Sequence, residues 1–429
     1  MPSAREKTQA AVLAAVDDMA GELVDVLRRM VRIPTVNPPG ECYEDFVAYM
    51  GGVLDDLGYT TEVVRVPEAE LDTLAAHGGG RPRPNLLGRL DGPGGPGPRL
   101  HLNGHYDVVR VGSNWTHDPF GADLVDGRVY GRGTGDMKAG LAAQIIAVEA
   151  LRRAGVDWRG TVTHSAVPDE ETVGVRNAGA GYLVEQGYIS RDNTDAVIIT
   201  EPFGPAGVGV GHKGAIWGEI TFHGRQAHGS SPRLGVNAVE AMAHALARVE
   251  RELQPRLAER VTELGVTPKE STSATLSFDT IRGGEATNIV PDRCSVTFNR
   301  RLLPAEPLAE SRSELLEIFE GVCAERDGLS MDYRESYSTA ATLVGEDEPV
   351  AAAAMSAVRH LDRTPQLLIS AGSDDQRFVV HNAGITNSII YGPGQTRLAH
   401  VSDEYIEVDD LVAGTKGLAL IMLDMLASA

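Results

Sequence analysis

TVTHSAVPDEE, residues 161–171, is the stretch that decides the fold, because it joins a predicted strand to a run of carboxylates. Residues 161–167 predict the strand, and Pro168 with the acidic triplet 169–171 ends it. Helices are predicted on both sides, at 137–153 and 175–186, and a further strand at 196–200. Helices that alternate with strands along a chain indicate an α/β layer built on a largely parallel sheet.

The same alternation extends toward both ends of the chain. A long helix is predicted from about 8 to 33, and Pro34 with the Pro/Gly-rich cluster 37–40 stops it. Further elements are a helix at 43–57, strands at 62–66, 85–88 and 99–102, and, after about 349, helices at 351–361, 376–382 and 409–428 with strands at 366–369 and 386–391. We predict an α/β fold with a mixed, largely parallel sheet and helices on both faces.

The rhythm changes between Gly211 and about residue 337. The predicted elements of this region follow the order βαββαβ: strand 215–222, helix 236–261, strands 274–280 and 288–302, helix 309–326 and strand 330–335. Four strands and two helices in this order resemble a ferredoxin-like domain. We therefore expect residues 1–212 and 338–429 to form one domain and residues 213–337 to be inserted into it.

Composition limits the possible partners. The 429 residues include 60 acidic and 39 basic ones, giving a formal net charge of -21 without a cluster of Lys and Arg. Such a chain would be repelled by nucleic acid and by anionic membranes. Three scattered cysteines fit neither a disulfide framework nor a CxxC site, and we find no signal-peptide core and no run of about 20 apolar residues. A cytoplasmic enzyme or binding protein is expected.

Two glycine-containing segments carry candidate metal ligands. LNGHYD, residues 102–107, places His105 and Asp107 two positions apart at a strand end, an arrangement that suits a ligand imidazole oriented by a carboxylate. The alternative is a strand-end histidine in an ordinary hydrogen-bond network. GRGTGDMK, residues 131–138, leads into a helix and lacks the pattern of a phosphate-binding loop. Its Asp136 suits a cation, or else caps the helix.

Three further carboxylates and one histidine complete the candidate set. Glu170 and Glu171 follow the strand 161–167, so that one glutamate could bind a metal while its neighbour takes a proton from water. The alternative is a solvated acidic loop. Glu201 ends another apolar strand, and His400 lies in RLAHVSDE, residues 397–404. Imidazole and carboxylate ligands with one carboxylate left over are what a two-metal hydrolase requires.

Taken in order, these segments resemble the aminoacylase, acetylornithine deacetylase, succinyl-diaminopimelate desuccinylase and carboxypeptidase family of co-catalytic metallohydrolases. The likeness covers nearly the whole chain. It implies two divalent ions per subunit, either Zn, Mn or Co, and an assigned role for each candidate residue. In that assignment His105 and Glu201 bind one ion, Glu171 and His400 bind the other, Asp136 bridges both, Asp107 orients His105 and Glu170 is the general base.

The resemblance also implies a homodimer formed through the inserted domain, which acts as a lid. His228 would reach the partner subunit's site and stabilise the oxyanion, and Asn288 and Arg301 would face the substrate. An arginine there suits a substrate carboxylate. The family usually has an acidic residue two positions before this arginine, whereas this chain has Asn299. Asp375 and Arg377 resemble a structural pair behind the site.

The expected function is metal-dependent hydrolysis of a C–N bond in a small carboxylate-bearing substrate, of the N-acyl amino acid deacylase type, with Glu170 activating the water. A dipeptidase or carboxypeptidase of the same family is the first alternative. An aminohydrolase acting on an aromatic amino acid-like substrate such as a nitroanthranilate is the second. A non-catalytic binding module and a phosphatase fit less well, because every ligand position is filled and no basic phosphate clamp is evident.

Overall fold

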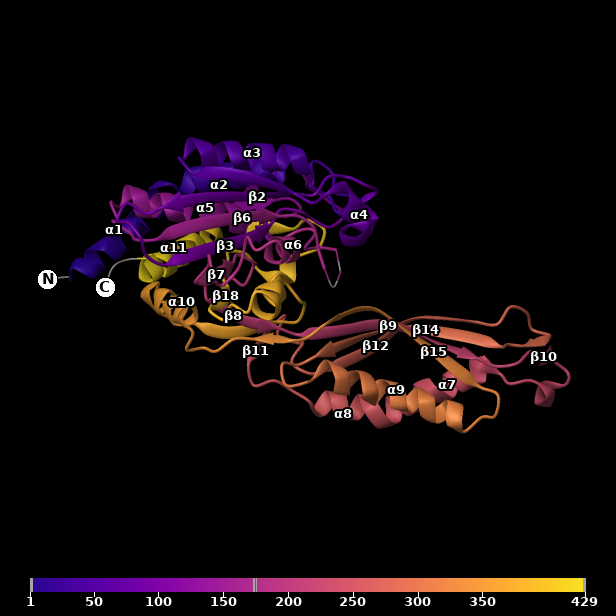
Figure 1. The fold of residues 1–429 in the computed structure, drawn as a ribbon. Helices are drawn as coiled ribbons and strands as arrows, with labels where there is room; N and C mark the ends of the chain where they lie inside the picture. Colours follow the sequence, from indigo (N-terminus) through magenta and orange to yellow (C-terminus); the bar gives the residue numbers. More distant parts are fainter. Residues whose placement is uncertain (1–2, 173, 175, 427–429) are drawn as a thin grey trace. The chain divides into compact units, whose positions relative to one another are not determined.

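The computed structural model describes residues 3–172, 174 and 176–426, and its chain divides into two compact units (Figure 1). Unit 1 comprises Met1–Gly211, Val344–Ile369 and Asp374–Ala429. Unit 2 comprises His212–Leu343 and Ser370–Ser373. In the described residues, no helix is both long and apolar enough to cross a membrane.

Unit 1 is built on a mixed sheet whose central pairs are parallel. The strand order is β1 (Thr60–Arg65), β2 (Pro84–Asp91), β6 (Thr161–Val167), β3 (Arg99–His105), β7 (Ala196–Ile199), β18 (Ser388–Ile390), β8 (Gly207–His212) and β17 (Gln366–Ser370). β6, β3, β7 and β18 pair in parallel, and His105 is opposite Val167 in the register. The residues that follow β3 and β6 therefore meet at one edge of the sheet.

Helices cover both faces of this sheet, which confirms the predicted fold class. Alternate residues of β7 show the two-sided burial: Ile198 packs into one apolar core and Ile199 into the other. The helices of the first core are α1 (Ala4–Asp18), α2 (Ala20–Val31), α3 (Tyr43–Asp56), α5 (Lys138–Arg153), α10 (Pro349–His360) and α11 (Val408–Leu426). α4 (Glu68–Leu74), α6 (Ala180–Glu185) and the π-helical turn Phe378–Asn382 belong to the second.

Three predicted elements differ from the structure in their bounds or continuity. The single helix expected over 8–33 is two helices, α1 and α2, which meet at Met19. Met19 is fully buried and both helices pack on α5, so tertiary packing determines the break. The strand expected over 288–302 is divided at Pro291, which lacks the amide that a continuous strand needs. The helix expected over 175–186 is shorter, because α6 covers only Ala180–Glu185. The predicted helix ends at 175 and 428 themselves lie outside the described residues.

A small antiparallel sheet, absent from the sequence-based prediction, positions part of the site. It consists of β4 (Asp123–Val125), β5 (Arg128–Tyr130) and β19 (Tyr405–Glu407), with Tyr405 opposite Tyr130. β5 directly precedes the turn that contains Asp136, and β19 directly follows the loop that contains His400. Their pairing holds these two segments together, although they are far apart in the sequence.

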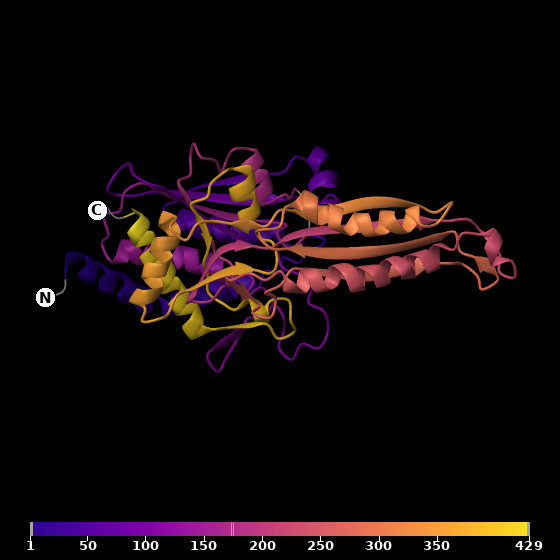
Figure 2. The ribbon, with the colours of Figure 1, turned by 90° about the horizontal axis from the view of Figure 1, so that it is seen from below.

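Unit 2 has a four-stranded antiparallel sheet with helices on one face (Figures 1 and 2). The strand order is β12 (Thr275–Gly283), β14 (Arg293–Leu302), β9 (Gly214–His223) and β15 (Ser330–Thr339). α7 (Ala238–Arg248), the π-helical turn Val249–Leu253, α8 (Gln254–Glu259) and α9 (Leu308–Ala324) cover it. The main elements follow the predicted order βαββαβ. The residues of β14 alternate between this helix-covered core and the open face.

Phe319 of α9 should be a main source of stability in unit 2. Its side chain is fully buried, and its ring lies 5.7 Å from that of Phe222 and 6.2 Å from that of Phe278, measured between centroids. We expect Phe319→Ala to lower the free energy of unfolding of unit 2 by about 3–5 kcal/mol, because it leaves a cavity in the core. Urea unfolding followed by the fluorescence of Trp217 measures this change.

The control for this experiment is Ile281→Ala, in the same unit but with a side chain that is 59% exposed. That variant should unfold within about 0.5 kcal/mol of the parent. Equal unfolding midpoints for Phe319→Ala and Ile281→Ala would contradict the assignment of Phe319 to the core.

Candidate active site

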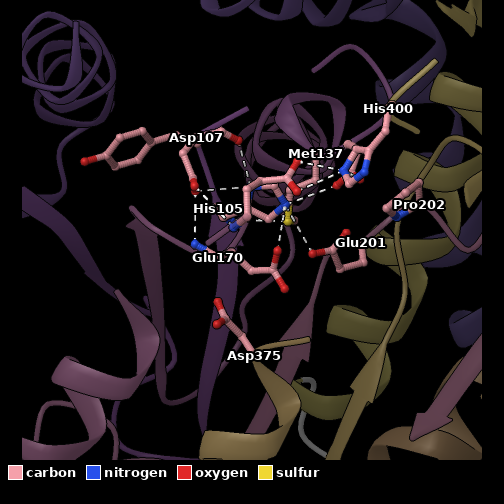
Figure 3. Close-up of polar contacts among 12 residues, drawn as sticks. His105, Asp107, Met137, Glu170, Glu201, Pro202, Asp375 and His400 are labelled. Atoms are coloured by element: carbon pink, nitrogen blue, oxygen red, sulfur yellow. Dashed lines mark hydrogen bonds and ion pairs between the residues drawn. The ribbon is translucent and has the colours of Figure 1, made fainter. Parts of the chain in front are cut away.

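His105 is buried at the end of β3 and uses its two ring nitrogens differently. Nδ1 lies 2.9 Å from the backbone oxygen of Asp107, so an Nδ1–H can donate there. Nε2 lies 3.1 Å from Asp136 Oδ1 and 3.3 Å from Glu201 Oε1 (Figure 3). Burial opposes protonation most strongly, but the charge of Glu201 and the hydrogen bonds to the neighbouring carboxylates together outweigh it and raise the pKa of His105 well above its usual value. The Nε2 atom thus points at a cluster of negative charge, as a metal ligand would.

Asp136 lies between two imidazoles. Its Oδ1 faces His105, while its Oδ2 is 3.3 Å from Nε2 of His400. The alternative role as a helix cap is wrong, because α5 has Met137 at its N-cap position and no side chain accepts a hydrogen bond there. One carboxylate with an oxygen toward each histidine has the arrangement required to bridge two cations.

His400 and Glu171 form the other side of the site. His400 Nε2 lies 2.9 Å from Glu171 Oε2, and the histidine side chain is 51% exposed. Glu404, which is completely buried, holds the His400 loop to the Asp136 turn: it accepts hydrogen bonds from Gly135 N at 2.9 Å and Asp136 N at 3.2 Å and pairs with Arg132. No motif in the sequence indicates this role for Glu404.

The donor atoms fall into two groups that fit divalent cations. His105, Asp136 and Glu201 form one group, and Asp136, Glu171 and His400 form the other; within each group the ligand atoms lie within 4.8 Å of one another. Burial, and then the charge of Asp136, raises the pKa of Glu171 to about 7 and that of Glu201 to about 8. Bound cations would relieve this repulsion, and imidazole with carboxylate suits Zn, Mn or Co.

Glu170 belongs to neither group. Its Oε2 is 4.0 Å from His105 Nε2, and Figure 3 shows its side chain directed at His105. Burial raises the pKa of Glu170 well above its usual value; the positive charge of His105 opposes this rise, while Glu201 and Asp375 add to it. Glu170 is therefore a carboxylate with high proton affinity beside both groups.

The turn 168–171 makes two adjacent glutamates diverge. Asp169 has left-handed backbone geometry, with φ at 61°. The carboxylate of Asp107 accepts hydrogen bonds from the backbone amides of Glu170 and Glu171, each at 3.2 Å. Asp107 thus holds the backbone that carries both glutamates, in addition to lying beside Nδ1 of His105 at 3.5 Å. This second role was not predicted.

Asp169 is anchored by residues that the sequence did not single out. Both Asp169 and Arg83 have 1% exposed side chains, and Arg83 Nε donates to Asp169 Oδ2 at 2.6 Å. Tyr43 Oη and Asn37 Nδ2 donate to Oδ1, each at 3.0 Å, and Asn37 also donates to Asp107 at 2.8 Å. The alternative of a solvated acidic loop is therefore wrong. The turn is fixed from behind by a buried network.

Asp375 adds a further buried carboxylate. It accepts a hydrogen bond from Asn103 Nδ2 at 3.0 Å, and Figure 3 shows it on the side of Glu170 away from His105. Burial raises the pKa of Asp375, and the charge of Arg377 opposes this rise. Asp375 and Arg377 are thus electrostatically coupled, and their structural role stays a prediction.

The remaining predicted residues lie in unit 2, in two places. His228 and Asn288 are both exposed and close together, because the short strands β10 (Ala227–His228) and β13 (Ile289–Val290) pair and Gly229 N donates to Asn288 O at 2.7 Å. His228 Nδ1 lies 2.8 Å from Ser230 Oγ. Arg301 is near the end of β14, where its guanidinium carbon lies 5.4 Å from the ring centroid of Trp217.

Comparison with known proteins agrees with this geometry. The model of peptidase family M20/M25/M40 matches residues 101–424. Succinyl-diaminopimelate desuccinylase of Rhodospirillum centenum is 31% identical over 404 residues, which cover 92% of this chain and 95% of that enzyme.

Two solved structures share the fold. Aminopeptidase PepT of Bacillus cereus has a TM-score of 0.73 at 21% identity, covering 95% of this chain and 98% of its own. The M20 family metallo-carboxypeptidase Sso-CP2 of Sulfolobus solfataricus has a TM-score of 0.71 at 19% identity, covering 94% and 99%. The family inferred from the motifs is thereby confirmed. This chain belongs to peptidase family M20/M25/M40 and is a metal-dependent hydrolase.

Proposed function

We propose that this enzyme hydrolyses the amide bond of an N-acyl amino acid, using two divalent ions. The observation that carries the proposal is the sharing of Asp136 between two His/carboxylate groups, with Glu170 left outside both. His105 and Glu201 would hold one ion and Glu171 and His400 the other, with Asp136 common to both. The metal can be Zn, Mn or Co, since the ligand set suits each of them.

The protein residues supply the proton transfers and the positioning. Bound divalent ions would polarise the scissile carbonyl and lower the pKa of water. Glu170, with its raised pKa, takes a proton from the attacking water and returns it to the leaving nitrogen. Asp107 fixes the ring of His105 and the backbone of Glu170, so that base and ligand keep their spacing.

Unit 2 would supply the substrate contacts, in a homodimer. We assign His228 to oxyanion stabilisation in the partner subunit's site. We assign Asn288 and Arg301 to direct contacts with the substrate. The exposure of His228 and Asn288 supports these roles. Arg301 is suited to a carboxylate because, among the described residues, none forms an ion pair with it.

The first substrate class to test is an N-succinyl amino acid, because the desuccinylase relative aligns over nearly its whole length. We expect N-succinyl or N-acetyl amino acids to be hydrolysed with kcat/KM at least about tenfold higher than dipeptides. A panel of these amides, dipeptides and amino-aromatic acids, assayed with Mn²⁺ or Zn²⁺, measures this preference. A reversed preference would identify a dipeptidase, and turnover of the aromatic acids alone would identify an aminohydrolase.

Glu170→Gln should lower kcat by about 10²–10⁴-fold, because the amide cannot accept the proton. Its metal content, measured by elemental analysis after dialysis, should equal that of the parent. Asp136→Ala should instead lose metal, since both groups share this carboxylate. Parent-like turnover by Glu170→Gln would show that the base is misassigned.

Metal binding should strengthen as pH rises. Glu171 and Glu201 have folded-state pKa values of about 7 and about 8, above the ordinary 4.5. Their protonation therefore stabilises the metal-free protein, and this stability is lost as pH rises through these values. A cation must displace those protons at low pH but not at high pH.

At one fixed Mn²⁺ concentration, the increase in Tm over EDTA-treated protein should therefore be larger near about pH 8 than near about pH 6. Glu201→Gln removes one of the two titrating glutamates and should reduce the difference between the increases in Tm at the two pH values. An increase in Tm that is the same at both pH values would contradict the proposed ligand set.

A further inference from the structure

Arg301 is a partly buried cation of unit 2 for which the described residues provide no carboxylate partner. It is half-buried, and burial lowers the pKa of its guanidinium. In the part of the chain that the structure describes, no ion pair involves Arg301, whereas the neighbouring Arg300 pairs with Glu306. A partly desolvated charge without a partner needs another source of stabilisation.

Trp217 on β9 supplies that stabilisation. The guanidinium carbon of Arg301 lies 5.4 Å from the centroid of the Trp217 ring, within the range of a cation–π interaction. An aromatic face attracts the cation without accepting its N–H groups in strong hydrogen bonds. The donor edge of Arg301 therefore stays available, which an aspartate or glutamate partner would not allow.

The Trp217 ring is itself fixed by its neighbours on the sheet. In the strand register Trp217 is opposite Asn299 on one side and Tyr337 on the other. The Tyr337 ring meets it edge-on with centroids 5.2 Å apart, and Tyr337 Oη lies 3.0 Å from Ser373 Oγ. Arg301 is two residues beyond Asn299 on β14, so all these side chains share the open face of the sheet.

We propose that Trp217 is the positioning residue for Arg301: it holds the guanidinium by its face so that the N–H edge can bind the substrate carboxylate. The neutral Asn299 on the same face leaves the positive charge of Arg301 uncompensated. This inference rests on the proposed role of Arg301 as the carboxylate contact. It identifies Trp217 as a determinant of preference for substrates with a free carboxylate.

The test compares an N-acetyl amino acid with its α-carboxamide, in which a neutral amide replaces the only carboxylate. The preference is measured as the ratio of kcat/KM values and, in a metal-loaded Glu170→Gln background, as the ratio of Kd values. Trp217→Leu and Trp217→Met should each reduce this ratio by about 3- to 30-fold, mainly by raising KM for the carboxylate. Trp217→Phe, which keeps an aromatic face, should retain most of the preference.

Two further variants make the outcomes distinguishable. Phe278→Leu changes a partly buried aromatic residue that packs against the core of the same unit, and it should leave the ratio unchanged. If Arg301→Ala abolishes the preference and both non-aromatic Trp217 variants keep it, the inference is overturned while the proposed function stands.

Two results would instead overturn the carboxylate contact in the proposed function. One is equal Kd values for both ligands in the Glu170→Gln protein without a further substitution. The other is an Arg301→Ala variant that keeps the preference. If kcat of the Trp217 variants falls by the same factor for both ligands and the ratio is unchanged, Trp217 has only a structural role. That result would overturn the inference.

Discussion

The parallel pairing of β3 with β6, with His105 opposite Val167, is the constraint on which the site depends. It places the end of one strand beside the end of the next. The carboxylate of Asp107, two residues after His105, therefore reaches the amides of Glu170 and Glu171. A shift of one residue in this register would turn the His105 side chain to the other face of the sheet.

A second constraint is the concentration of negative charge at that edge. Buried carboxylates are stable only when hydrogen bonds or opposite charges compensate them. Asp169 is compensated from behind by Arg83, Tyr43 and Asn37, and Glu404 by Arg132 and two amides. Within the described part of the chain, the side-chain oxygen atoms of Asp136, Glu171 and Glu201 have only histidines as partners. The protein thus neutralises Asp169 and Glu404 with its own groups and leaves Asp136, Glu171 and Glu201 for cations.

The sequence predicted the parts of the fold and site that depend on local pattern. Strands 161–167 and 196–200, and the helix 137–153, are local periodicities, and residues that follow parallel strands meet at one edge, so His105, Glu171 and Glu201 could be placed together. Arg83 and Asn37 could not, because they contact Asp169 from 86 and 132 positions away through loops without a motif.

The break at Met19 was also beyond reach of the sequence, since packing on α5 rather than a Gly or Pro signal causes it. The small sheet β4–β5–β19 escaped prediction because its strands are only three residues long. The roles of His228, Asn288 and Arg301 came from resemblance alone and stay proposals.

The order of the ligands along the chain has a consequence for synthesis. His105, Asp136 and Glu201 all precede unit 2, whereas His400 follows it, close to the C-terminus. The ribosome adds about 5–20 residues per second, so the roughly 200 residues after Glu201 separate the two groups by about 10–40 s. β18, which lies between β7 and β8, also emerges in that interval. A nascent chain therefore exposes one complete set of ligands well before the other set can exist.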